Sequence, residues 1–307
     1  MPDISTVDPL TPVQAPCKHA SCLICGSASI AGLLGYHGSK GLVRCRACGF
    51  VFMERIPTEQ ELNAYYSSYS YTTEGYLSPI TVKRYQELLD EFEPYRKSGR
   101  LLDVGCGRGY FLIEARKRGW EVHGTEYSEA AIRLGERNGI TMHAGKLGPD
   151  SFPEGVFDVV TSFEVMEHIN NPLEDLAHIH RALRDGGLYY CTTPNFNSLL
   201  RYHLKDRYNI INYPEHLSYY TRSTLGRVLR TAGFRKRKVL TTGISLSRLK
   251  TSKGDKGEPL IAADSSDERL RQRIDSRWHM EVAKNLVNRL LSITGLGMSL
   301  KGYFEKP

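Results

Sequence analysis

The sequence predicts a doubly wound α/β fold with a mostly parallel, seven-stranded sheet, preceded by a small cysteine-rich module. Two observations support this prediction. From residue 100 onward, short apolar segments alternate with helical patterns, which is typical of parallel strands joined by helices that cover both faces of a sheet. Before that point, four of the seven cysteines form two closely spaced pairs within residues 22–48.

Each predicted strand is a short apolar run, and each predicted helix repeats apolar residues every three or four positions. The predicted strands are 101–104, 121–125, 140–143, 157–162, 187–193, 234–241 and 299–305. The predicted helices are 82–92, 110–118, 128–137, 172–183, 221–232 and 268–292. Ser128 is a typical N-cap, and Gly119 and Gly233 end the helices before them. Residues 248–268 are polar and contain glycine and proline, which indicates a mobile loop.

The composition is that of an ordinary globular protein, with 40% hydrophobic and 24% charged residues among 307. No apolar segment is long enough to span a membrane, and residues 1–16 lack the basic start and apolar core of a secretory signal. We therefore expect a cytoplasmic protein with a flexible N-terminal tail. The net charge of +7 favours anionic partners modestly, although a slightly basic surface without specific meaning is the simpler interpretation.

The two cysteine pairs predict a structural zinc site. They are Cys22 with Cys25 and, after 19 intervening residues, Cys45 with Cys48. Each pair offers two thiolates from one tight turn, and two such turns complete a tetrahedral site with no open position. The alternative is a set of reduced, buried cysteines. Cys17 and His19 lie close by and are treated as bystanders, although either could replace a ligand.

A glycine-rich turn between the first predicted strand and its helix indicates a cofactor site. Gly105, Gly107 and Gly109 are spaced as G-x-G-x-G after Asp103. Glycine lets the backbone approach a ligand closely, and the helix N-terminus offers N–H groups. Glu126, at the end of the next strand, is placed to accept hydrogen bonds from ribose hydroxyls. A dinucleotide site would instead favour G-x-G-x-x-G.

This turn resembles motif I of the class I S-adenosylmethionine-dependent methyltransferases, which have a Rossmann-like fold. Residues 157–169, 183–187 and 192–195 resemble the fourth strand, the turn into the fifth strand and the end of that strand in this family. Within the family, the chain is similar to the ubiquinone-pathway O-methyltransferase-like group. Segments 45–52 and 57–66 are similar to the members of that group that carry a zinc ribbon.

The resemblance implies a methyltransferase that uses S-adenosylmethionine. The residues that it places around this cofactor are Asp103, Gly105, Cys106, Gly107, Gly109, Glu126, Tyr127, Phe163 and Glu164. Many family members also carry an acidic residue after the third strand, near the adenine amine. Here residues 144–147 have no carboxylate, so we expect backbone groups or Asp150 to take that place.

The expected organisation has four parts. A tail (1–16) precedes a zinc ribbon (17–55), a tyrosine-rich linker with a helix (56–98) and a methyltransferase domain (99–307) with a variable insertion at about 245–292. The tyrosines of 65–76 either close over the cofactor or acceptor, or pack as an ordinary linker. The apolar face of 268–292 indicates core packing, a homodimer contact or a substrate lid.

Acidic and histidine side chains follow the fourth predicted strand, beside the expected position of the methyl group. They are Glu164, Glu167 and His168. His168 is a candidate general base for an acceptor hydroxyl. Alternatively, the three residues bind a divalent ion, as in relatives with Glu-x-x-Glu-His and a later histidine, for which His216 is the best candidate. In a third interpretation, Glu167 and His168 only satisfy the loop backbone.

The leading functional hypothesis is O-methylation of a small molecule, such as a sugar, a glycan precursor, a lipid-linked compound or a natural product. An RNA methyltransferase is the alternative, but the ribbon has few basic residues interleaved with aromatic ones. The basic run 235–238 is expected on a solvated sheet edge. A non-catalytic zinc-ribbon protein is opposed by the intact glycine turn and Glu126.

Overall fold

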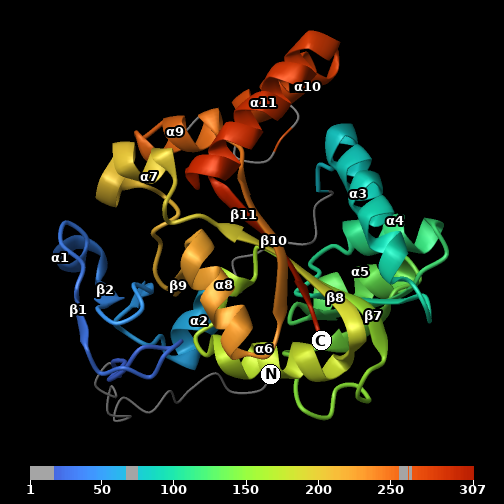
Figure 1. Ribbon diagram of the computed structural model, residues 1–307, viewed down its shortest axis with the longest axis horizontal. Coiled ribbons are helices and arrows are strands. Elements are labelled where there is room, and N and C mark those ends of the chain that lie inside the picture. The colour runs from blue at the N-terminus through green and yellow to red at the C-terminus, as the bar shows by residue number, and fades with distance from the viewer. Residues whose placement is uncertain (1–16, 67–74, 256–261, 263–264) are drawn as a thin grey trace, which may run out of the picture.

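The computed structural model describes residues 17–66, 75–255, 262 and 265–307 (Figure 1). The expected tail 1–16, part of the tyrosine-rich stretch (67–74) and part of the polar segment (256–261 and 263–264) lie outside the described residues. Among the described helices, none is both long and apolar enough to cross a lipid bilayer.

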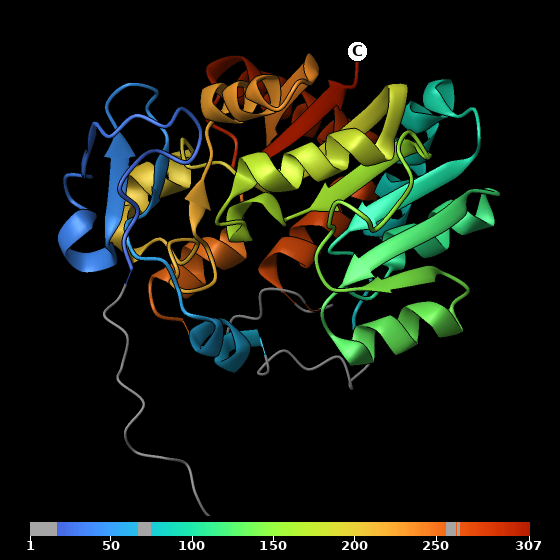
Figure 2. The same cartoon turned by 90° about the horizontal axis from the view of Figure 1, so that it is seen from below.

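A seven-stranded sheet forms the centre of the described structure (Figures 1 and 2). Its order is β10–β11–β8–β7–β4–β5–β6. The strands are β4 Arg100–Val104, β5 Glu121–Glu126, β6 Thr141–Ala144, β7 Phe157–Phe163, β8 Leu183–Pro194, β10 Arg235–Thr242 and β11 Ser299–Glu305. β11 pairs antiparallel with both of its neighbours, β10 and β8, and the other described pairs in this sheet are parallel. The predicted mostly parallel, seven-stranded sheet is therefore confirmed.

Helices cover both faces of this sheet, as a doubly wound fold requires (Figure 1). On one face lie α3 Pro79–Phe92, α4 Tyr110–Lys117 and α5 Glu129–Arg137; on the other lie α6 Pro172–Ala182 and α8 Arg222–Thr231. Leu89, Phe92 and Phe111 pack α3 and α4 onto the sheet. Leu176 and Leu225 belong to the apolar cluster on the opposite face.

The cysteine-rich module contributes most of a second, four-stranded sheet. Its order is β1–β2–β3–β9, with β1 Ile30–Gly32, β2 Leu42–Cys45, β3 Val51–Met53 and β9 Ser218–Tyr219. The short helices α1 His37–Lys40 and α2 Glu59–Tyr66 flank these strands in the sequence. β9 comes from the distant segment that follows α7 Leu199–Leu204, and it pairs antiparallel with β3. The sequence did not indicate this fourth strand.

Two predictions for the C-terminal region were wrong. The expected single helix 268–292 is two helices, α10 Ser266–Asp275 and α11 Trp278–Thr294, because Arg277 between them has extended backbone angles. The expected loop 248–268 contains α9 Leu246–Ser252. The Asp267 carboxylate accepts hydrogen bonds from the Leu246 and Ser247 amides (2.6 and 3.1 Å), so a distant residue stabilises the start of α9.

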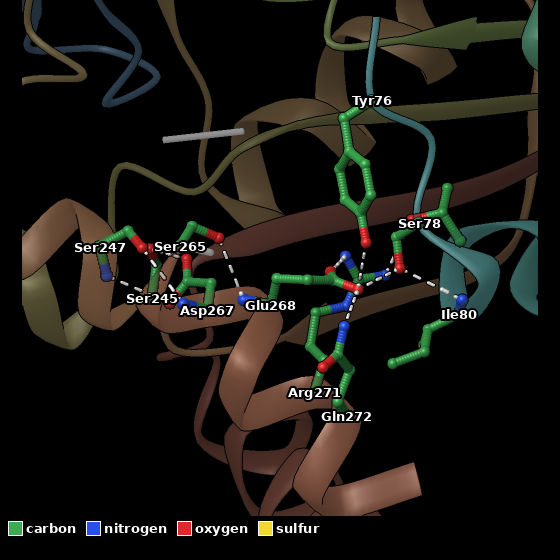
Figure 3. A network of polar contacts seen from close by, with 11 residues as sticks. Tyr76, Ser78, Ile80, Ser245, Ser247, Ser265, Asp267, Glu268, Arg271 and Gln272 are labelled. Carbon is green, nitrogen blue, oxygen red and sulfur yellow. Dashed lines mark hydrogen bonds and ion pairs between the residues drawn. The ribbon is translucent and has the colours of Figure 1, made fainter. Parts of the chain in front are cut away.

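A buried carboxylate holds α10 against the N-terminus of α3 (Figure 3). Glu268 accepts hydrogen bonds from the hydroxyls of Ser78 (2.6 Å) and Tyr76 (3.1 Å), and Arg271 lies 3.3 Å away as a counter-ion. Ser78 is also the N-cap of α3. Since Tyr110, at the start of α4, donates to the Gly75 carbonyl (2.9 Å), this network continues to the helix that follows the glycine turn.

We expect Glu268→Ala to lower the free energy of unfolding by about 2–4 kcal/mol, because it leaves a half-buried arginine and two hydroxyls without their acceptor. Urea unfolding followed by circular dichroism would measure this loss. The matched control is Asp275→Ala, which removes an exposed ion pair with Lys83 on the same helix and should cost no more than about 1 kcal/mol. Equal losses of unfolding free energy in the two variants would contradict the stabilising role of Glu268.

Candidate active site and zinc site

The four cysteines of the two pairs converge on one point. Their Sγ atoms all lie within 4.8 Å of one another, with 3.4 Å between Cys22 and Cys48 and 3.6 Å between Cys25 and Cys45. A tetrahedral zinc ion with Zn–S bonds of about 2.3 Å requires S···S distances of about 3.8 Å, so the thiols fit this metal. Cys17 and His19 are not part of this group.

Two matching turns position the thiols. The amide of Gly26 donates to the Cys22 carbonyl (3.0 Å), and the amide of Gly49 donates to the Cys45 carbonyl (2.9 Å). Both glycines have positive φ, +69° and +79°, which residues with a Cβ rarely adopt. The sequence therefore encodes each half of the site locally, and the pairing of β1, β2 and β3 brings the halves together.

The glycine turn follows β4 at the point where the strand order reverses, between β4 and β7, and this is where doubly wound folds bind ligands. Gly105, Gly107 and Gly109 all have left-handed backbone angles. A Cβ on Gly105 would lie 2.8 Å from Val165, and a Cβ on Gly109 would lie 2.5 Å from Ile140. Both positions therefore require glycine.

Two carboxylates flank this turn. Glu126, at the end of β5, accepts hydrogen bonds from the amides of Gly107 (2.9 Å) and Tyr127 (2.8 Å). Asp103 is buried and accepts a hydrogen bond from the Thr161 hydroxyl (2.7 Å). Burial raises the pKa of Asp103 to about 7. Both carboxylates thus hold polar groups of the turn and its neighbouring strand.

The other predicted cofactor residues are Cys106 in the turn, the exposed Tyr127 and the partly buried Phe163. Cys106 donates its amide to the Thr125 carbonyl (3.0 Å), which fixes the turn against β5. Tyr127 is 72% exposed beside Glu126 and is open to a ligand. Phe163 ends β7 and packs on Phe111, with 5.0 Å between ring centroids.

Residues 144–147, directly after β6, carry no carboxylate. Lys146 is paired with Asp175, and Asp150 is exposed to solvent. The amide of Gly145 donates to the Glu126 carbonyl (2.7 Å), so the backbone of this segment lies beside the end of β5.

Strain marks the end of β7. Glu164 has a φ of +54°, which is uncommon for a residue with a side chain and often occurs at functional sites. The residue as a whole is exposed, yet desolvation by the surrounding protein atoms raises the pKa of its carboxyl group. Val165 follows directly and contacts the turn at Gly105, so the two segments touch.

Three of the predicted catalytic residues meet next to this point. Ligand atoms of Glu167, His168 and His216 all lie within 4.8 Å of one another, and the two imidazole centroids are 4.9 Å apart. Glu164 is outside this group. Glu167 is buried and accepts a hydrogen bond from Thr193 (2.8 Å) at the end of β8, a residue that the sequence did not single out. Burial, and then the nearby charge of Glu164, raise the pKa of Glu167 well above its ordinary value.

Backbone carbonyls accept hydrogen bonds from both imidazoles. The Nδ1–H of His168 donates to the Glu215 carbonyl (2.8 Å), and the Nδ1–H of His216 donates to the Ile210 carbonyl (2.6 Å). Burial lowers the pKa of His168 and lowers the pKa of His216 to about 4, so both rings are neutral at pH 7. In His216, a neutral ring protonated at Nδ1 carries its lone pair on Nε2, the arrangement typical of metal-ligating histidines, whereas the ring of His168 is also hydrogen-bonded to the backbone of Glu164.

The zinc ribbon is connected directly to this cluster. The amide of Leu217 donates to the Glu167 carbonyl (2.8 Å), and the amide of Met53 in β3 donates to the Leu217 carbonyl (2.9 Å). His216 therefore directly precedes Leu217, which a hydrogen bond from β3 of the ribbon holds in place. His19 adds a side-chain contact with Asn170 (2.8 Å). Contacts between residues so far apart in the sequence cannot be predicted from a local sequence pattern.

Comparisons with known proteins agree with this architecture. A family described as a methyltransferase domain matches residues 78–239. A SAM-dependent methyltransferase from Archaeoglobus fulgidus matches with a TM-score of 0.50 and 22% identity, over 74% of this chain and 93% of that protein. Phosphoethanolamine N-methyltransferase 2 from Haemonchus contortus, solved with S-adenosyl-L-methionine, has a TM-score of 0.51 and 17% identity over 84% and 63% of the two chains.

Sequence relatives match a shorter region. The ubiquinone biosynthesis O-methyltransferase of Ruegeria pomeroyi is 35% identical over 104 residues, which is 32% of this chain and 42% of that protein. The protein of the same name from Pseudomonas aeruginosa is 30% identical over 105 residues, 32% and 45% of the two chains. The match thus spans less than half of these relatives. The fold is that of class I S-adenosylmethionine-dependent methyltransferases, and the chain belongs to the methyltransferase-domain family.

Proposed function

We propose that this protein transfers the methyl group of S-adenosylmethionine to a hydroxyl oxygen of a small molecule, such as a sugar, a glycan precursor, a lipid-linked compound or a natural product. One observation carries the proposal. The glycine turn touches Val165, which lies between Glu164 and the Glu167–His168–His216 cluster. A cofactor on the turn and an acceptor at the cluster would therefore be neighbours, as direct displacement at a methyl carbon requires.

On the cofactor side, the turn glycines would admit the methionine part of S-adenosylmethionine, with Asp103 below them. Glu126 would accept a hydrogen bond from a ribose hydroxyl, since a carboxylate has about four acceptor sites and three are used by the amides of Gly107, Tyr127 and Ser128. The exposed ring of Tyr127 would cover the ribose or adenine. Phe163 packs against Phe111 at the start of α4, the helix that follows the glycine turn.

On the acceptor side, the cluster would take the hydroxyl proton. The Glu167 carboxylate and one ring nitrogen of each of His168 and His216 form a donor set that suits a divalent transition metal. Such an ion would lower the pKa of a bound hydroxyl. Glu164, accessible and adjacent, would hold the acceptor. In the alternative arrangement, His168 alone acts as the general base.

Two further parts complete the proposal. The cysteine site holds a structural Zn²⁺, and the chain comprises the ribbon (17–55), the linker (56–98) and the methyltransferase domain (99–307). The sequence relatives are named as O-methyltransferases, which supports oxygen as the accepting atom. RNA is disfavoured as an acceptor because Arg235 and Arg237 of the basic edge strand pair with Glu305 and are not left for phosphates.

We expect S-adenosylmethionine and S-adenosylhomocysteine to bind the purified protein with micromolar affinity, and Glu126→Ala to weaken both by about 10–100-fold. The variant loses charge-assisted hydrogen bonds to the ribose and the acceptor that orders Gly107. Isothermal titration calorimetry measures both effects.

The matched control is Glu129→Ala, which removes a neighbouring exposed carboxylate on α5 that pairs only with Arg133 among the described contacts (3.0 Å). Its affinity should equal that of the wild type. Failure of the zinc-loaded, folded wild type to bind either nucleoside would refute the proposed function. Loss of binding in the control variant would show that the effect of Glu126→Ala is not local.

A further inference from the structure

The last long helix presents its most apolar face to solvent. Along α11 the exposed large side chains are Trp278 (78%), Val282 (58%), Leu286 (59%), Val287 (45%), Leu290 (54%) and Ile293 (69%). Trp278, Val282, Leu286 and Leu290 are spaced by four residues, and Ile293 continues this face, so they form one ridge along the helix. We call these six residues the α11 ridge. Figure 1 shows α10 and α11 extending beyond the sheet.

The opposite side of α11 is polar and is bonded to the sheet edge. Asn288 accepts a hydrogen bond from the Gly243 amide (2.9 Å), and Ser292 both accepts from the Thr241 amide (3.0 Å) and donates to its carbonyl (3.1 Å). Leu291 is the one buried residue of the helix. These bonds fix the rotation of the helix, so the α11 ridge cannot turn inward to find a core.

The area of the α11 ridge is that of an interface. An aromatic side chain has roughly 150–250 Å² of surface and an aliphatic one less, so these six residues, 45–78% exposed, offer at most on the order of 700 Å² of apolar surface. The largest apolar patch on a typical monomer is roughly 300–600 Å², whereas a stable complex buries about 800 Å² on each partner.

The ridge is complementary to itself. If two copies of α11 pack antiparallel about a twofold axis at Leu286, Leu286 faces its own copy and Val282 of one copy faces Leu290 of the other. The centre of the ridge is then apolar on both sides, Trp278 lies opposite Thr294 next to Ile293, and the two helix dipoles are antiparallel, which is favourable. The charged residues of α11 are Glu281, Lys284 and Arg289, and the first two pair with each other (3.6 Å). This weak net charge suits a protein partner better than a lipid surface or a nucleic acid, which favour strongly cationic helices.

From this geometry we propose that the α11 ridge is a homodimer interface in which two copies of the chain pair about Leu286. The proposal is independent of the methyl-transfer function. Sedimentation equilibrium of the full-length protein should give twice the chain mass of 34.7 kDa at micromolar concentrations. Leu286→Glu places two like charges at the axis and should raise the dissociation constant at least about 100-fold.

A charge-swap experiment makes the test specific. Leu286→Glu and Leu286→Lys should each be monomeric, and their equimolar mixture should form a heterodimer, because the axis places residue 286 of one copy opposite residue 286 of the other. Leu34→Glu, at a 95% exposed site on the ribbon, is the control and should remain dimeric. A monomeric wild type, a dimeric Leu286→Glu variant, or a wild-type monomer that binds phosphatidylglycerol vesicles through α11 would overturn the proposal.

Discussion

Replacing His216 by alanine is expected to remove one of two bound metal equivalents and to reduce methyl transfer at least about 1,000-fold, while the affinity for S-adenosylmethionine stays within about twofold. The imidazole supplies one of three converging ligand atoms, and its Nδ1–H bond to the Ile210 carbonyl fixes the orientation of the ring. Without it, Glu167 and His168 offer only two ligands, too few to retain a divalent ion at a catalytic site.

Two measurements test this expectation. Metal analysis after equilibration with Zn²⁺ or Mn²⁺ counts the bound ions, and calorimetry with S-adenosylhomocysteine reports the cofactor site. His203→Ala, at an exposed histidine near the end of α7, is the matched control and should keep both equivalents. A wild-type protein that holds only the cysteine-bound ion would contradict the metal assignment. His168 would then be the general base, and methyl transfer should persist in the presence of a chelator.

The parts of the site that the sequence predicted are those encoded within one turn. The cysteine pairs and the G-x-G-x-G segment each fix their own geometry through glycines with positive φ. Glu126 could be placed because it ends a strand next to β4 in a parallel sheet. His216 was found only through the resemblance, because its neighbour Glu215 lies 47 residues after His168 in the sequence and only tertiary structure brings the two into contact.

The parts that the sequence missed depend on distant partners. β9 has two residues and becomes a strand only because β3 pairs with it. α9 forms in a polar segment because Asp267, about twenty residues away, accepts hydrogen bonds from its first amides. The break before α11 carries neither glycine nor proline, so apolar spacing continues across it. The same spacing could not show that the apolar face of α11 points outward, because that depends on the bonds of Asn288 and Ser292.

Removal of the ribbon zinc is expected to abolish most methyl transfer, by about 100-fold or more, without weakening S-adenosylhomocysteine binding. Structural zinc contributes on the order of 10–16 kcal/mol to the folding of small modules, so the ribbon sheet should not persist without it. β3 would then release Leu217, whose amide bonds to Glu167, and His216 would lose its fixed position. The glycine turn lies in the other sheet and should remain intact.

Cys45→Ser is the variant of choice, because Cys45 is a buried ligand at the end of β2, and Cys17→Ser is the control, because Cys17 is exposed and outside the site. Hydrogen exchange needs no knowledge of the acceptor. In Cys45→Ser the amides of Met53 and Leu217 should exchange faster by at least about 100-fold, while the amide of Gly107 keeps its protection through Glu126. If Leu217 stays protected in a zinc-free ribbon, then the methyltransferase domain alone orders His216, and the ribbon must serve another purpose.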